Sequence, residues 1–128
     1  MRIAALVALV LVGCASSDPA TRRREEFFEA HPDTSPDVRR AIEEGEVLLG
    51  MTHAEVVASL GRFDSAGPDV SDLGAYHVRL YGTKALTFHG EEIEDAELIF
   101  SARWSDDPTF GKLRRRILWH RERHDREP

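Results

Sequence analysis

The spacing of apolar positions along the chain changes near residue 75. Before it, apolar residues recur at helical intervals, as in the stripe formed by Val56, Val57 and Leu60. After it, apolar and polar residues alternate with a period of two, in runs that begin at Tyr76, Leu86 and Leu98. The pattern therefore predicts helices in the first half of the chain and strands in the second.

Capping signals define the helices. A short helix is predicted over residues 21–30. A second, over residues 36–44, is indicated by Ser35 at its N-cap, by Pro36 at its first position and by Gly45 at its end. Thr52 and Glu55 have the spacing of a capping box, which predicts a third helix over residues 53–60.

The alternating runs predict a three-stranded antiparallel sheet with one face buried against the helices, an α+β fold. A three-residue loop over residues 82–84 would place the apolar residues of the first two strands on the same face. In that register Leu80 lies opposite Leu86 and Val78 opposite Phe88. The residues of the runs are Tyr76, Val78 and Leu80, then Leu86 and Phe88, then Leu98, Phe100, Ala102 and Trp104.

The N-terminus has the pattern of a lipoprotein signal peptide. Arg2 precedes an apolar run over residues 3–12, which is too short to span a membrane. Cys14, the only cysteine of the chain, follows Gly13 at the position where bacterial lipoproteins are acylated. We therefore expect lipidation at Cys14, and Ala15 in place of an aspartate favours the outer membrane. An ordinary signal peptide that happens to end in a cysteine is the alternative.

Length and charge complete the domain organisation. A chain of 128 residues has room for one domain. We predict a signal peptide over residues 1–13, a lipidated flexible linker over 14–20, an α+β domain over 21–110 and a basic C-terminal segment over 111–128. Residues 14–110 hold 9 basic and 20 acidic residues, whereas residues 111–128 hold 7 and 3. The C-terminal segment is therefore basic on an acidic protein, and both a helix and a strand are compatible with it.

The stretch from Ala41 to Gly61 contains a recognisable motif. Gly50-Met51-Thr52 is followed by Val56 and by Leu60-Gly61. This spacing resembles the SmpA/OmlA (BamE-like) family of small outer-membrane lipoproteins, in which two helices pack on a three-stranded antiparallel sheet. The resemblance implies an accessory role in the assembly of outer-membrane β-barrels. Inhibitor proteins share a similar architecture, and fold alone does not give function.

The histidines are the candidate metal ligands. In the expected register His77 and His89 lie opposite each other on the solvent face, and Glu97 joins them if it pairs with His89. His120 and His124 are four residues apart, with Asp125 beside them. A solvent-exposed strand face and a solvated basic tail explain both sets without a metal, so we assign no metal or cofactor.

Catalytic motifs are missing from the sequence. The serines have no G-x-S-x-G setting, no phosphate-binding loop occurs, and the acidic run over residues 91–97 lacks EF-hand spacing. Export and an acidic body argue against nucleic acid as a partner. The basic C-terminal segment could contact anionic lipid or dock on acidic residues 91–97.

Together these patterns predict an outer-membrane-anchored lipoprotein that acts as a non-enzymatic binding or scaffold module with a protein partner in the envelope. The alternative is a periplasmic inhibitor or ligand-binding lipoprotein with the same fold.

Overall fold

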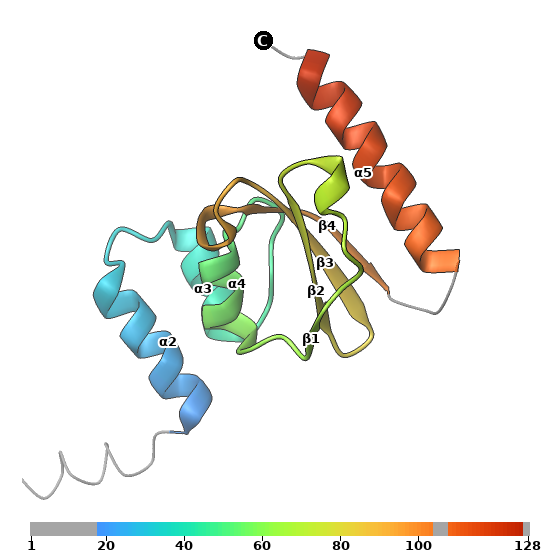
Figure 1. Cartoon of the computed structure of the whole chain (residues 1–128). Coiled ribbons are helices and arrows are strands. Elements are labelled where there is room, and N and C mark those ends of the chain that lie inside the picture. The colour runs from blue at the N-terminus through green and yellow to red at the C-terminus, as the bar shows by residue number, and fades with distance from the viewer. Residues whose placement is uncertain (1–17, 104–107, 127–128) are drawn as a thin grey trace, which may run out of the picture.

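The computed structural model describes residues 18–103 and 108–126 (Figure 1). The predicted signal peptide, the lipidation site Cys14 and Trp104 lie outside the described residues, as does the side chain of Phe110.

The three predicted N-terminal helices are confirmed as α2 (Pro19–Ala30), α3 (Pro36–Glu44) and α4 (His53–Leu60). Helix α2 begins earlier than predicted because the Asp18 carboxylate caps it, accepting a hydrogen bond of 2.7 Å from the backbone N–H of Thr21. Residues 18–20, which we assigned to the linker, therefore form the start of this helix.

The capping signals of α3 and α4 act as expected. Ser35 caps α3, and Gly45 ends it in the left-handed conformation with φ 71°. Both hydrogen bonds of the Thr52–Glu55 capping box are present at the start of α4. Met51 is buried at 1% exposure. The motif residues that we compared with lipoproteins thus have local structural roles.

The sheet contains four antiparallel strands in the order β1-β2-β3-β4. They are β1 (Ser65–Ala66), β2 (Tyr76–Tyr81), β3 (Lys84–His89) and β4 (Glu97–Arg103), with short 3-10 turns at Ser71–Leu73 and Ile93–Asp95. The predicted α+β class is confirmed, and β1 is a strand that the sequence pattern did not predict.

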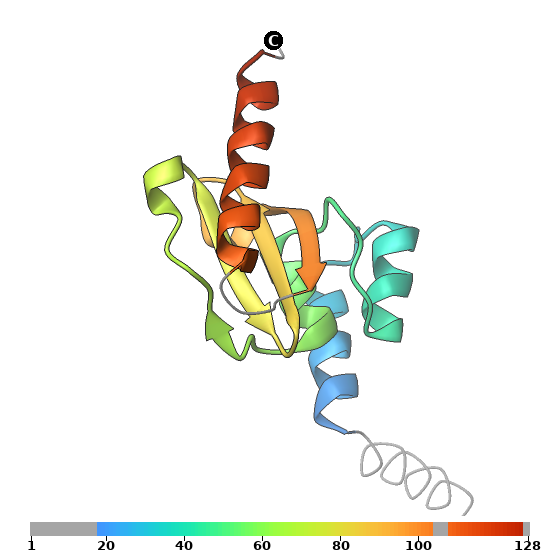
Figure 2. The ribbon, with the colours of Figure 1, turned by 90° about the vertical axis from the view of Figure 1, so that its right-hand side faces the viewer.

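Helices cover both faces of this sheet. Helices α3 and α4 pack on one face, and the C-terminal segment forms a long helix, α5 (Pro108–Arg126), on the other (Figures 1 and 2). Each face has its own core. The first contains Ala41, Ile42, Met51, Val56, Ala58, Leu86, Phe88, Ala96 and Leu98. The second contains Val70, Leu73, Tyr76, Val78, Ala85, Phe100, Leu113 and Ile117.

The predicted register of the first hairpin is wrong by one residue. The turn contains two residues, Gly82 and Thr83, so that Tyr81 pairs with Lys84, Leu80 with Ala85 and Val78 with Thr87. Gly82 has φ 58°, which suits a tight hairpin turn. Our register assumed that only one face was buried, whereas Val78 faces the α5 core and Leu86 and Phe88 face the other core.

A bulge in β4 breaks the alternation that we predicted for the third strand. Thr87 pairs with Phe100, but Phe88 pairs with Leu98, so Ile99 is an extra residue in β4. The bulge turns Leu98 toward the α3–α4 core and Phe100 toward α5. These two residues therefore lie on opposite faces of the sheet instead of the same one.

Helix α2 is attached to the domain through two arginines. The Arg23 guanidinium donates to the carbonyl oxygens of Ala58 (3.0 Å) and Ser59 (3.2 Å), at the end of α4. Arg24 donates to Ser59 O (2.9 Å) and to Glu43 O (3.4 Å), at the end of α3. Cations at helix C-termini satisfy unpaired carbonyl groups and interact favourably with the helix dipole. Phe27 and Phe28 pack against the α3–α4 core beside them.

Candidate functional site

The structure separates the two histidines that we paired from sequence. His77 lies opposite Phe88, and His89 lies opposite Tyr76. His77 Nε2 is 2.9 Å from the carbonyl oxygen of Gly90, which fixes its ring locally. The expectation that His77 and His89 lie opposite each other is therefore wrong, because the true register places these residues on opposite faces of the hairpin.

His89 instead meets the two histidines of α5. Its ring centroid lies 5.3 Å from that of His120 and 5.0 Å from that of His124, and the latter two are 5.9 Å apart. Tyr76 stacks near His89 at 4.6 Å, and its hydroxyl shares a hydrogen bond of 2.8 Å with His120 Nδ1. We call His89, His120 and His124 the histidine cluster. It joins the end of β3 to the C-terminal half of α5.

The surroundings of His89 favour its neutral ring. Burial lowers the pKa of His89 below its ordinary value, and the neighbouring rings of His120 and His124 lower it further. Glu97 and Glu91 act in the opposite direction. Glu97 pairs with His89 across the β3–β4 ladder. This is the pairing under which the sequence analysis placed Glu97 beside His89.

As their side chains stand, no three or more histidine, cysteine or acidic residues within residues 18–103 and 108–126 are grouped to hold a metal ion.

A fourth histidine, His53, lies in the core and was not singled out from sequence. It is 4% exposed, and neither of its ring nitrogens has a hydrogen-bond partner among the residues that the structure describes. Its ring makes edge contacts with Phe88 at 5.0 Å and Phe63 at 6.0 Å. Burial lowers its pKa, the charge of Arg79 adds to this, and Glu94 opposes it. In the sequence His53 is recognisable only as the residue that follows the capping residue Thr52. That position gives no sign that its side chain is buried.

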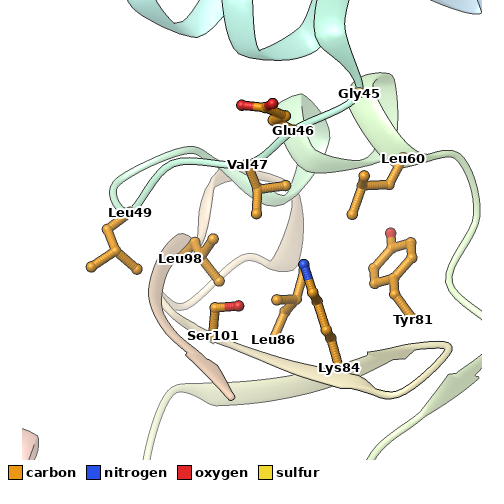
Figure 3. A pocket seen from close by; sticks show the side chains of 10 residues that line it. All are labelled: Gly45, Glu46, Val47, Leu49, Leu60, Tyr81, Lys84, Leu86, Leu98 and Ser101. Atoms are coloured by element: carbon orange, nitrogen blue, oxygen red, sulfur yellow. The ribbon is translucent and has the colours of Figure 1, made fainter. Parts of the chain in front are cut away.

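A groove opens between the loop after α3 and the sheet (Figure 3). Its volume is about 450 Å³. Leu86 and Leu98, both buried, lie at its base, and Lys84 extends across it toward the loop. Leu49 at its rim is 69% exposed. The other lining residues are Gly45, Glu46, Val47, Leu60, Tyr81 and Ser101.

The outer face of α5 is basic. Lys112, Arg115, Arg116 and Trp119 surround a shallow hollow there, and Trp119 is 55% exposed. Within the described part of the chain, the salt bridges of α5 join Arg114 to Asp72 (2.7 Å), an acidic residue of the domain outside the run 91–97, and Arg126 to Glu122 (3.5 Å).

Comparisons with known proteins leave the family open. No helix among the described residues is long and apolar enough to cross a membrane. No family model, no curated protein and no solved structure matches this chain. The likeness to the SmpA/OmlA lipoproteins therefore stays a prediction from the motif.

Proposed function

We propose that this chain is a lipid-anchored protein of the bacterial outer membrane, facing the periplasm, whose domain is a non-enzymatic binding or scaffold module. The groove beside β4 is the observation that carries the proposal. It combines a buried apolar base with an exposed leucine at its rim, a combination that an isolated domain does not need for stability. The lipobox-like sequence ending at Cys14 supports the anchor.

The groove borders a strand edge that is only partly covered. Gly50 donates to Leu98 O at 2.8 Å, and Leu98 donates to Met51 O at 2.8 Å, so the first part of β4 is capped by the loop. Within the described residues, no strand pairs with the outer edge of β4 over residues 99–103. An extended peptide can add to such an edge through backbone hydrogen bonds and place an apolar side chain in the neighbouring groove.

The partner that this proposal names is a component of the machinery that assembles outer-membrane β-barrels. Its support is the resemblance over residues 41–61 and the order of lipobox, helices and antiparallel strands along the chain. The groove itself would equally serve an inhibitor that binds a soluble enzyme, or a receptor for a small ligand, since its volume falls in the range of small-molecule sites. The experiment below distinguishes these possibilities.

The test is crosslinking in living cells with a photoreactive amino acid at position 49, followed by purification and mass spectrometry. The matched control places the same amino acid at Glu25, an exposed position on α2 away from the groove. We expect adducts with barrel-assembly components at position 49 and none at position 25. The adducts should disappear in a Cys14→Ser chain, which cannot be acylated.

Two outcomes would contradict the proposal. Adducts with a soluble periplasmic enzyme would replace the scaffold function with that of an inhibitor. Adducts that form without Cys14 would remove the anchor from the function, and adducts that form equally at positions 49 and 25 would remove the groove from it.

A further inference from the structure

We propose that His89, His120 and His124 bind a divalent transition-metal ion, with Zn²⁺ as the test ion, and that the bound ion fastens α5 to the end of β3. The proposal rests on the meeting of these three side chains across two elements and is independent of the proposed scaffold function.

The spacing of the three rings suits a tetrahedral ion. A Zn–N bond of about 2.0–2.1 Å places the centre of an imidazole roughly 3.2 Å from the metal. Two such rings at a tetrahedral angle then have centroids about 5.2 Å apart. The observed separations in the histidine cluster are 5.0, 5.3 and 5.9 Å. The backbone of the fold therefore already places the rings at the distances that such a site requires.

Ring rotation is the adjustment that binding needs. In the structure the rings of His120 and His124 are nearly parallel, at 22°, and that of His89 is inclined to them by 65° and 69°, so their nitrogens do not form a metal site as they stand. His124 is exposed and the other two are half-buried, so rotation does not require the core to open. His120 and His124 lie one turn apart on α5, the spacing at which two histidines of one helix bind the same ion.

Tyr76 supplies the orientation that metal-binding histidines usually have. Its hydroxyl shares a hydrogen bond with His120 Nδ1, so we assign Nε2 as the nitrogen of His120 that would bind the ion and expect the rings of His89 and His124 to make the rotation. Glu97 or water would complete the four ligands, since Glu97 is the ladder partner of His89.

The ion would add to the contacts of the second half of α5, where His120 shares a hydrogen bond with Tyr76 and Arg121 donates to the carbonyl oxygen of Leu73 at 3.3 Å. Among the residues of α5 whose side chains the structure describes, Leu113 and Ile117 are buried, and the Arg114–Asp72 salt bridge lies between them along the helix. From His120 onward the helix carries no buried apolar residue within its described part. A metal at the histidine cluster would attach this second half to the sheet.

Calorimetric titration with ZnCl₂ tests the site directly. The full-length chain should carry Cys14→Ser, which removes the only thiol, and should have no polyhistidine tag. We expect one Zn²⁺ per chain. Replacing one ligand by His124→Gln should weaken binding at least about tenfold, because even outer-shell partners of metal ligands contribute about 10–100-fold. His31→Gln, at the residue that follows α2, is the matched control and should leave the affinity unchanged.

Two further readouts separate metal binding from a merely structural role. In NMR spectra, Zn²⁺ should shift the ring signals of His89, His120 and His124 and leave those of His31, His53 and His77 unshifted. Hydrogen exchange should slow for the amides after His120 when the ion is added. Tyr76→Phe keeps the buried ring and should weaken binding about tenfold through the lost hydrogen bond.

The proposal is overturned if the Cys14→Ser chain shows no saturable Zn²⁺ binding. It is also overturned if binding survives His124→Gln and His89→Gln unchanged, or if the shifted ring signals belong to His31, His53 or His77.

Discussion

Replacing His53 by leucine should make the protein more stable, although the change removes a core side chain. His53 is 4% exposed and both of its ring nitrogens lack partners. A buried polar group without a hydrogen bond costs about 1–3 kcal/mol in folding free energy. Leucine has nearly the same volume and no polar atom, so it can keep the contacts with Phe88 and Phe63 without this penalty. We expect a gain of about 1–2 kcal/mol near neutral pH.

The same substitution should flatten the dependence of stability on pH. The pKa of His53 is lower in the folded chain than its ordinary value of 6.5, mainly because of burial. Below pH 6.5 the unfolded chain therefore binds more protons than the folded one, and the free energy of unfolding falls as the pH falls. One such group contributes a slope of at most about 1.4 kcal/mol per pH unit. His53→Leu removes the contribution of His53 to this pH dependence and leaves the contribution of His89, whose pKa is also lowered.

Urea unfolding followed by far-ultraviolet circular dichroism, at several pH values between about 5 and 8, measures both effects. A gain of 1 kcal/mol in a domain of this size also raises the Tm by about 4 °C or more. His31→Gln serves as the control for loss of an exposed histidine. A variant that is less stable than the parent at neutral pH, or that loses stability below pH 6.5 as steeply as the parent, would refute this account of His53.

Three further substitutions test the caps, the α5 core and the hairpin. Thr52→Ala removes the capping-box hydroxyl and should lower the unfolding free energy by about 1 kcal/mol, whereas Thr83→Ala in the hairpin turn should change it little, as urea midpoints would show. Ile117→Ala should lower the unfolding free energy by about 2–5 kcal/mol because Ile117, on the side of α5 that faces the sheet, is fully buried. Leu118→Ala, on the exposed side of the helix, should lower it far less. Equal losses would mean that α5 does not pack as described. Gly82→Ala forces a side chain into φ 58° and should lower the melting temperature by a few degrees, worth about 1 kcal/mol, and an unchanged melting temperature would contradict the two-residue turn.

The helices could be predicted because their signals are local. Ser35, Gly45 and the Thr52–Glu55 pair each act on backbone groups within a few residues, so neither the sheet nor the rest of the fold had to be known. The start of α2 was misplaced only because Asp18 and Pro19 were interpreted as linker residues, although together they form a capped helix start.

The sheet register could not be predicted because it depends on a helix far away in the chain. Val78 and Phe88 are both apolar, and a single buried face would place them together. Helix α5 buries the second face, and each residue then belongs to a different core. Since the sequence left α5 open as helix or strand, the pattern gave no reason to prefer the two-residue turn. The bulge at Ile99 is invisible for the same reason.

The histidine cluster could not be predicted from the sequence either, because it depends on where α5 packs. The i, i+4 spacing of His120 and His124 was evident in the sequence, and so was the alternation that includes His89. Only the position of α5 across the end of β3 brings the two sets together, at 5.0 and 5.3 Å. Sequence spacing therefore identified the right residue type but the wrong partner for His89.

The attachment of α2 through Arg23 and Arg24 has a mechanical consequence for a chain tethered at Cys14. A pull on the tether would load this helix first, and its guanidinium–carbonyl hydrogen bonds lie near the surface, unlike the ladder of the sheet. The 12 residues of α2 span about 18 Å as a helix and up to about 40 Å when extended. Detachment and stretching of this one element would lengthen the reach of the domain from the membrane by about 20 Å, with the loss of the contacts that Phe27 and Phe28 make with the α3–α4 core. In a chain anchored at Cys14 as we propose, α2 would then be an extensible segment between the lipid and the domain.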